Sequence, residues 1–192
     1  MKAYDFLQWL HIAEKMKCQF RHSFTTCGRK ESVAEHSYRL ILMAYILKEK
    51  LPQVDMDKVI EMAIIHDLGE AVMGDIPSFL KTKKDEKLEE EAFSDFTKNL
   101  PAQVRENIGL LYEEMNKMES LEAKVFKALD KMEAVIQHNE ADISTWLDIE
   151  YQLQLDYGVE EAQVHDYLKE LRQIVLKESQ NKIEKATEEK NK

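Results

Sequence analysis

Apolar side chains recur every three or four positions through most of the chain, which is the spacing of one face of an α-helix. From Ser32 onward, the sequence SVAEHSYRLILMAYILKEKL shows this spacing, with Val33 and Leu40 on the apolar face. Ser32 and Glu35 stand three residues apart at its start and form a capping-box motif. The pattern therefore predicts a helix that begins just after Ser32.

Further segments repeat the helical pattern, and the first of them has Asp55 or Asp57 as its N-cap. Pro101 stands where the first turn of a helix accepts proline. These predicted helices are DMDKVIEMAIIHDLGEAV, KLEEEAFSDFTKNL, PAQVRENIGLLYEEMNKM, SLEAKVFKALDKMEAVIQH and residues 160–178. Residues 143–164 fit neither a helix nor a strand pattern clearly. With only 5 glycines and 3 prolines to interrupt it, the chain is expected to be all-α.

The chain has 192 residues, 44% of them hydrophobic, which is enough to bury the core of one globular domain. No internal repeat and no linker divides it. We expect a single domain over residues 1–180, followed by a charged C-terminal tail at 181–192 that frays.

The charge balance bears on possible partners. With 27 basic and 37 acidic side chains the net charge is −10, which disfavours a nucleic-acid polymer because such binding relies on a basic surface. A small phosphate ester stays possible, since one or two arginines can hold a phosphate. The longest apolar run, from Leu40 to Leu47, is far below the roughly 20 residues that span a bilayer. Asp5 and His11 stand where a signal peptide would be apolar, so we expect a cytoplasmic protein with no membrane contact.

Side chains that suit a metal ion fall on three predicted helices. His36 lies on the first, the pair His66 and Asp67 near the end of the second, and Asp130 beside the apolar face of a later one. A single histidine is more often a hydrogen-bonded structural residue. Two imidazoles with two carboxylates, however, suit a divalent ion such as Mn, Fe, Co, Ni, Zn or Mg and leave positions open for water and substrate.

A further carboxylate follows at helical spacing. Glu70 comes three residues after Asp67, so on a continuous helix it projects from the same side, one turn further on. The segment VMGDIPS comes next, in which Gly74 permits a tight turn, Asp75 adds a carboxylate and Pro77 ends the helix. Taken alone, this segment is more typical of a polar loop than of a binding site.

These residues together resemble a known family. ESVAEHSYR, AIIHDLGEAVMGDIPS and EAKVFKALDKMEA give the pattern H…HDxxE…GDxP…D, which is similar to that of the HD-domain metal-dependent phosphohydrolases, and within them the 5′-deoxynucleotidase branch. The resemblance runs from about Phe20 to His138. It implies an HD-domain helical bundle with a metal site in its core, and a homodimer. It also implies that one divalent metal is held by His36, His66, Asp67 and Asp130.

The resemblance implies further roles outside the metal ligands. Arg21 matches the arginine that orients the substrate phosphate, although nothing in its local sequence distinguishes it from Arg29 or Lys30 and by that sequence alone it would be interpreted as a surface residue. Asp75 matches a residue that faces the sugar. The predicted catalytic residues are Glu70 for proton transfer, Asp67 and Arg21. The predicted substrate-binding residues are Arg21, His22, Asp75, Ile76, Pro77 and Ser78.

Position 22 departs from the family pattern. The branch has a tryptophan directly after the phosphate-orienting arginine, where it packs near the sugar and helps to exclude a 2′-hydroxyl, whereas this chain has His22. A histidine can hydrogen-bond where an indole only packs, so the sequence leaves open whether ribonucleotides are accepted as well as deoxyribonucleotides. A half-exposed loop histidine fits His22 equally well. The other histidines, His11, His138 and His165, are interpreted as structural or solvated.

The expected activity is hydrolysis of a (deoxy)nucleoside 5′-monophosphate to a nucleoside and phosphate. Two alternatives stay open. One is an HD phosphohydrolase that acts on a cyclic nucleotide, a triphosphate or a nucleotide second messenger. The other is a non-catalytic nucleotide-binding or metal-binding interaction protein, against which the presence of Glu70 and Arg21 beside all four ligands argues, because a structural metal needs neither.

Overall fold

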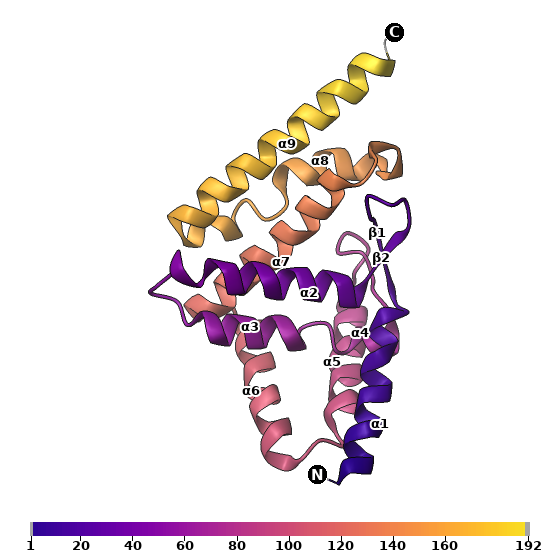
Figure 1. Ribbon diagram of the computed structural model, residues 1–192, viewed down its shortest axis with the longest axis vertical. Coiled ribbons are helices and arrows are strands. Elements are labelled where there is room, and N and C mark those ends of the chain that lie inside the picture. The colour runs from indigo at the N-terminus through magenta and orange to yellow at the C-terminus, as the bar shows by residue number, and fades with distance from the viewer. Residues whose placement is uncertain (1, 191–192) are drawn as a thin grey trace.

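The computed structural model describes residues 2–190, and over them the chain is mostly helical, as predicted (Figure 1). The α-helices are α1 (Ala3–Ala13), α2 (Val33–Ile46), α3 (Met56–Ile65), α4 (Glu70–Met73), α5 (Lys83–Thr97), α6 (Ala102–Lys117), α7 (Leu121–Glu140), α8 (Asp148–Asp156) and α9 (Asp166–Lys190). Short 3₁₀ turns are η1 (Glu14–Lys17), η2 (Leu47–Glu49), η3 (Ile143–Thr145) and η4 (Glu161–Val164). No helix within residues 2–190 is both long enough and apolar enough to cross a bilayer.

The helix starts follow the capping signals of the sequence. The Ser32 hydroxyl accepts a hydrogen bond from the Glu35 amide at 3.3 Å, and the Glu35 carboxylate accepts one from the Ser32 amide at 2.9 Å. This is the predicted capping box, and α2 begins directly after it. Asp55 caps α3 by accepting from the Lys58 amide. Pro101 is the N-cap of α6, one position before the helix.

A two-stranded hairpin precedes α2, which the sequence pattern did not predict. Strands β1 (Phe20–Phe24) and β2 (Lys30–Ser32) pair antiparallel, and β1 also contacts α7. Gly28 has φ +79° in the connecting turn, a backbone conformation that side chains with a Cβ rarely adopt. The hairpin matters because β1 carries Arg21 and His22 to the side of the helical core.

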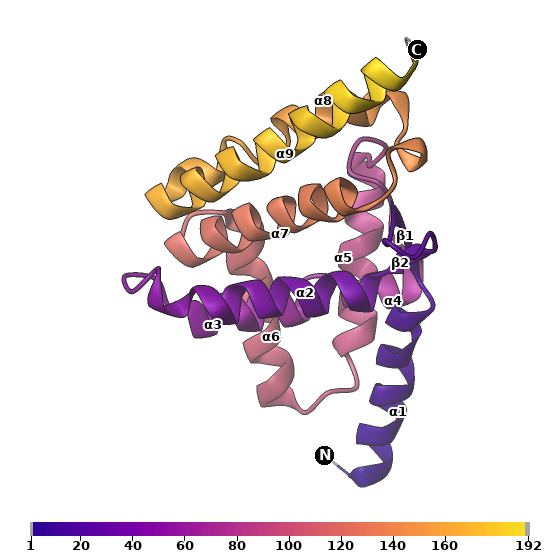
Figure 2. The same ribbon diagram turned by 45° about the horizontal axis from the view of Figure 1, so that its top comes forward.

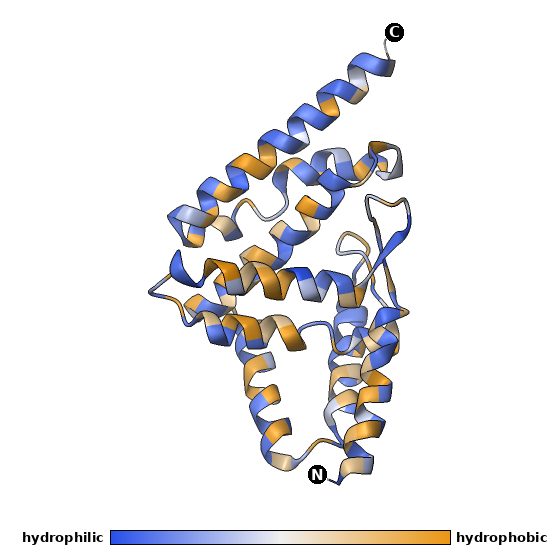
Figure 3. Ribbon diagram, viewed as in Figure 1, coloured by the Kyte–Doolittle hydropathy of each residue, from blue (hydrophilic) through white to orange (hydrophobic). Residues whose placement is uncertain are grey.

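The core lies where α2, α3 and α7 pack together. Leu40, Val59, Met62 and Leu129 are fully buried there. Apolar positions concentrate on α2 and α3, whereas the far half of α9 is largely hydrophilic (Figure 3). His36 lies one turn before Leu40 on the same face of α2 and is 0% exposed, so the core helices themselves carry a polar group into the interior.

The C-terminal third forms a layer over α7. Helix α9 packs along both α7 and α8, as Figure 2 shows. The segment 143–164, which was ambiguous in sequence, contains η3, α8 and η4, and the helix expected from residue 160 begins instead at Asp166. Residues 181–190, which we expected to fray, continue α9 in the structure. The domain limits themselves stay a prediction.

Candidate metal centre

The four side chains predicted to bind metal meet at one point in the structure. His36 Nε2 lies 3.3 Å from His66 Nε2 and 3.3 Å from Asp130 Oδ1. The fourth group completes the cluster, because Asp67 Oδ2 lies 2.9 Å from His66 Nε2 and 3.8 Å from His36 Nε2. Atoms that share an ion at 2.0 to 2.1 Å in a tetrahedral arrangement are roughly 3.4 Å apart. The spacing of this cluster therefore suits a common ion.

Hydrogen bonds fix which nitrogen of each histidine faces the cluster. His66 Nδ1 lies 2.9 Å from the Ala63 carbonyl, which can only accept, so Nδ1 carries the hydrogen. His36 Nδ1 donates in the same way to the buried Glu133 carboxylate. Both Nε2 atoms consequently face one another and two carboxylates, which is the usual arrangement of metal-binding histidines whose other ring nitrogen is held by an outer-shell acceptor.

The charges and the hydrogen bonds of this four-residue cluster suit a bound cation. Within residues 2–190, Asp67 Oδ2 is buried and has no hydrogen-bond partner. Burial lowers the pKa of His36, but the carboxylates of Glu133 and Asp130 raise it to about 10, so the cluster retains a proton where positive charge is needed. Burial also raises the pKa of Asp67, yet His66 lowers it to about 2. The residues present therefore fit a divalent metal.

Glu133 supports the centre and was missed in the sequence. It is 0% exposed and accepts a hydrogen bond from Arg39 Nε at 2.6 Å, while Arg39 also donates to Gln137 at 2.7 Å. These contacts join α2 to α7 and hold His36 in position. One signal was available, because Glu133 follows Asp130 by three residues and so lies on the same face of the helix.

Glu70 lies beside the cluster but not on a continuous helix with it, contrary to the expectation from spacing. Helix α3 ends at Ile65, and residues 66–69 form a turn before α4. The Glu70 amide donates to the Asp67 carbonyl at 2.9 Å, which keeps the two side chains close. Burial together with Asp67 and Asp75 raises the pKa of Glu70 to about 10. These surroundings favour the protonated form of its carboxyl group.

Arg21 is a pocket residue and not the surface residue that its local sequence suggests. Its side chain is only 15% exposed, with one terminal nitrogen 3.9 Å from Asp67 and 4.0 Å from Asp75. Its Nε lies 3.5 Å from Glu31, which is also buried. Burial raises the pKa of Asp75, although Arg21 opposes this shift. The positively charged guanidinium thus lies among three acidic side chains that neutralise it.

A cavity of about 830 Å³ opens over the cluster. Its lining includes all six residues predicted to bind substrate: Arg21, His22, Asp75, Ile76, Pro77 and Ser78. Gly74, at φ +81°, makes the turn that brings this loop to the cavity. The sequence did not indicate other parts of the wall, such as Phe79, Lys127 and Tyr157. A cavity of this size is in the usual range for small-molecule sites.

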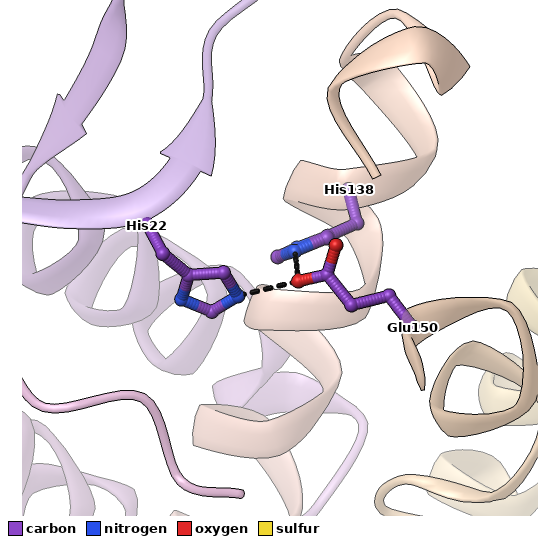
Figure 4. A group of neighbouring side chains, drawn as sticks. All are labelled: His22, His138 and Glu150. Carbon is purple, nitrogen blue, oxygen red and sulfur yellow. Dashed lines mark hydrogen bonds and ion pairs between the residues drawn. The ribbon is translucent and has the colours of Figure 1, made fainter. Parts of the chain in front are cut away.

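His22 lies in the cavity wall and is held there by a partner that the sequence did not reveal. Its Nε2 is 2.6 Å from Glu150 Oε1, and its ring meets Phe79 edge-on with centroids 5.4 Å apart. His138, which was interpreted as structural or solvated, is buried and binds the same Glu150 oxygen (Figure 4). Position 22 is therefore an ordered part of the pocket.

Three comparisons bear on this geometry. The family profile described as HD domain matches residues 13–172. The 5′-deoxynucleotidase HDDC2 of Homo sapiens is 34% identical over 142 residues, 72% of this chain and 69% of that protein. The 5′-deoxynucleotidase HDDC2 of Dictyostelium discoideum is 33% identical over 143 residues, 69% of this chain and 75% of that protein.

A solved structure shares the fold. The predicted metal-dependent phosphohydrolase from Magnetospirillum magnetotacticum superposes with a TM-score of 0.78 at 22% identity, covering 93% of this chain and 95% of that one. The segment matched by the family profile includes the four clustered side chains as well as Glu70 and Arg21.

Proposed function

This chain belongs to the HD-domain family of phosphohydrolases, and we propose that it hydrolyses (deoxy)nucleoside 5′-monophosphates to a nucleoside and inorganic phosphate. The observation that carries the proposal is that Arg21 and Glu70 line the same cavity as His66, Asp67 and Asp130, three of the four clustered side chains. Relatives about one third identical are named 5′-deoxynucleotidases, which supports this substrate class. A cytoplasmic location and a homodimer belong to the same proposal.

One divalent ion, Mn, Co, Ni, Fe, Mg or Zn, would be held by His36, His66, Asp67 and Asp130, whose ligand atoms lie close together. When bound, such an ion supplies Lewis acidity, which polarises phosphoryl oxygens and lowers the pKa of water from about 15.7 toward 7. Glu133 keeps His36 in the orientation that binding requires.

Arg21 orients the phosphate. Its planar fork of donors matches two oxygens of a phosphate monoester dianion. In the absence of substrate, Asp67 and Asp75 balance its charge from about 4 Å away. A phosphate entering the cavity meets a guanidinium that is already confined by its neighbours, so little ordering is needed on binding.

Glu70 moves the protons of the reaction. Water attacks phosphorus and the bond to the 5′-oxygen breaks, so that the leaving alcohol needs a proton. A carboxyl group whose pKa is raised to about 10 retains a proton to give to that oxygen. The attacking water then returns a proton to the Glu70 carboxylate, which restores the starting state.

Sugar selectivity is expected to depend on position 22. His22→Trp should raise the ratio of kcat/KM for deoxyribonucleotides over ribonucleotides by about 10-fold or more, because a packed indole leaves less room for a 2′-hydroxyl. The measurement is kcat/KM for paired deoxy and ribo 5′-monophosphates at one metal concentration. Phe20→Trp is the matched control, because Phe20 lies on the same strand and is 54% exposed. An unchanged ratio in His22→Trp would show that position 22 does not reach the sugar.

The test of the proposed activity is phosphate release from a panel of nucleotides. Purified protein reloaded with each metal in turn is given 5′-monophosphates, 3′-monophosphates, cyclic nucleotides and triphosphates. The proposal expects 5′-monophosphates to be turned over best. Preferential hydrolysis of a cyclic nucleotide or triphosphate would favour the alternative HD substrate, and no turnover of any nucleotide would favour the non-catalytic alternative.

A further inference from the structure

A second group of metal-type ligands lies on the cavity wall, apart from the HD cluster. It consists of His22 on β1, His138 on α7 and Glu150 on α8. His22 Nε2 is 2.6 Å and His138 Nε2 is 2.9 Å from the same oxygen, Glu150 Oε1. Figure 4 shows the ring of His22 on β1 and the ring of His138 on α7, both directed at this carboxylate. The three ligand atoms all lie within 4.8 Å of one another.

The contact between His138 and Glu150 requires a positive charge, either a proton or a metal ion, between the two side chains. His138 Nδ1 is 3.0 Å from the Ala134 carbonyl, which can only accept, so Nδ1 carries the hydrogen. In the neutral ring, Nε2 is then a lone pair that faces the Glu150 carboxylate. Two acceptors at 2.9 Å repel unless a proton or a metal ion lies between them.

Both oxygens of the Glu150 carboxylate have close polar neighbours, and Oε1 is the one that faces the two histidines. Its second oxygen accepts from the Leu147 amide at 2.6 Å, which fixes the side chain at the start of α8. Glu150 is 1% exposed and His138 is 6% exposed, so this charge lies away from solvent. A buried carboxylate in this position requires a cationic partner.

We propose that His22, His138 and Glu150 bind a second divalent transition-metal ion. Two imidazoles and one carboxylate are a donor set typical of zinc sites that keep coordination positions open. His138 shows the same outer-shell contact as His66 of the HD cluster, because each donates Nδ1–H to a backbone carbonyl of its own chain segment. The open positions face the cavity, since all three ligands line it.

The geometry needs only a small adjustment to hold an ion. Ligand atoms on a tetrahedral ion are roughly 3.4 Å apart, so the contacts of 2.6 and 2.9 Å must widen by less than an ångström. His22 can make this movement because its side chain is 27% exposed and lies on the hairpin. On the other side, Trp146 donates to the His138 carbonyl at 3.0 Å and keeps that ligand in place.

The proposal is tested by counting bound metal. Metal-free protein is titrated with Zn²⁺ by calorimetry, and Co²⁺ absorption spectra report the ligand environment of each ion. We expect two ions per chain in the native protein. His138→Ala and His22→Asn should each weaken the affinity of the second site for metal by roughly 100-fold or more and leave the affinity of the HD cluster unchanged. Asp130→Asn should abolish metal binding at the HD cluster and leave metal binding at the second site unchanged.

Two controls make the outcome unambiguous. His11→Ala removes an exposed histidine on α1 and should still bind two ions. Circular dichroism and the thermal midpoint identify any variant that fails to fold, and His22→Asn changes the most exposed ligand and so tests the site if His138→Ala unfolds. Binding of one ion per chain in the native protein, lost in Asp130→Asn and unchanged in His22→Asn and His138→Ala, would overturn the second site without affecting the proposed phosphohydrolase activity.

Discussion

Replacing Glu70 with glutamine should lower kcat for nucleoside 5′-monophosphates by about 10²- to 10⁴-fold, because the amide retains the shape of the side chain but cannot transfer the proton. The residue is 7% exposed, and burial beside Asp67 and Asp75 raises its pKa to about 10. In residues 2–190, its Oε2 is buried without a hydrogen-bond partner, so that oxygen is available to a substrate. The measurements are phosphate release, metal content and nucleotide affinity on the same preparation.

The metal content and the nucleotide affinity of Glu70→Gln should stay close to those of the native protein, since Glu70 is not one of the four clustered ligands. Glu86→Gln is the matched control, because it removes an exposed carboxylate that also lines the cavity. If Glu70→Gln loses its metal, Glu70 is a ligand. If its kcat is near normal, proton transfer must be assigned to another group.

Arg21→Ala should reduce kcat/KM by about 10²- to 10³-fold, the usual effect of removing a preorganised donor that meets developing charge. Arg21→Lys should recover only part of this loss, because one ammonium group cannot reproduce the planar fork. The steady-state comparison uses one 5′-monophosphate at saturating metal.

The control for Arg21 is Arg29→Ala on the other side of the hairpin turn. Arg29 is exposed and pairs with Glu35 at 2.5 Å, so its removal should leave kcat/KM nearly unchanged. Equal activity of the native protein, Arg21→Ala and Arg21→Lys would mean that Arg21 does not contact the phosphate.

Local signals in the sequence were sufficient to predict most helices. The capping box of Ser32 and Glu35 and the N-cap at Asp55 are interactions within one turn, so they can be recognised without knowledge of the tertiary structure. The hairpin gave no comparable signal, because β2 spans only Lys30–Ser32 and β1 does not alternate regularly between apolar and polar residues. Similarly, helical spacing alone did not reveal the turn that separates His66 from Glu70.

The sequence pattern did not predict which residues from distant segments contact one another. Glu133 reaches His36 across 97 positions and Glu150 reaches His22 across 128, so neither pairing follows from spacing along the chain. Arg21 is similar in its local sequence to Arg29, and only the family resemblance distinguished the two. The packing of β1 against α7 explains why Arg21 is nevertheless confined in the pocket.

The most direct test of the central claim compares phosphate release from a deoxynucleoside 5′-monophosphate by metal-free and metal-reloaded protein, with Asp130→Asn measured in parallel. The account predicts no release by the metal-free protein, release after reloading with at least one of Mn, Co, Ni, Fe, Mg or Zn, and none by reloaded Asp130→Asn. Equal release by the metal-free and the reloaded protein, or full activity in Asp130→Asn, would contradict it.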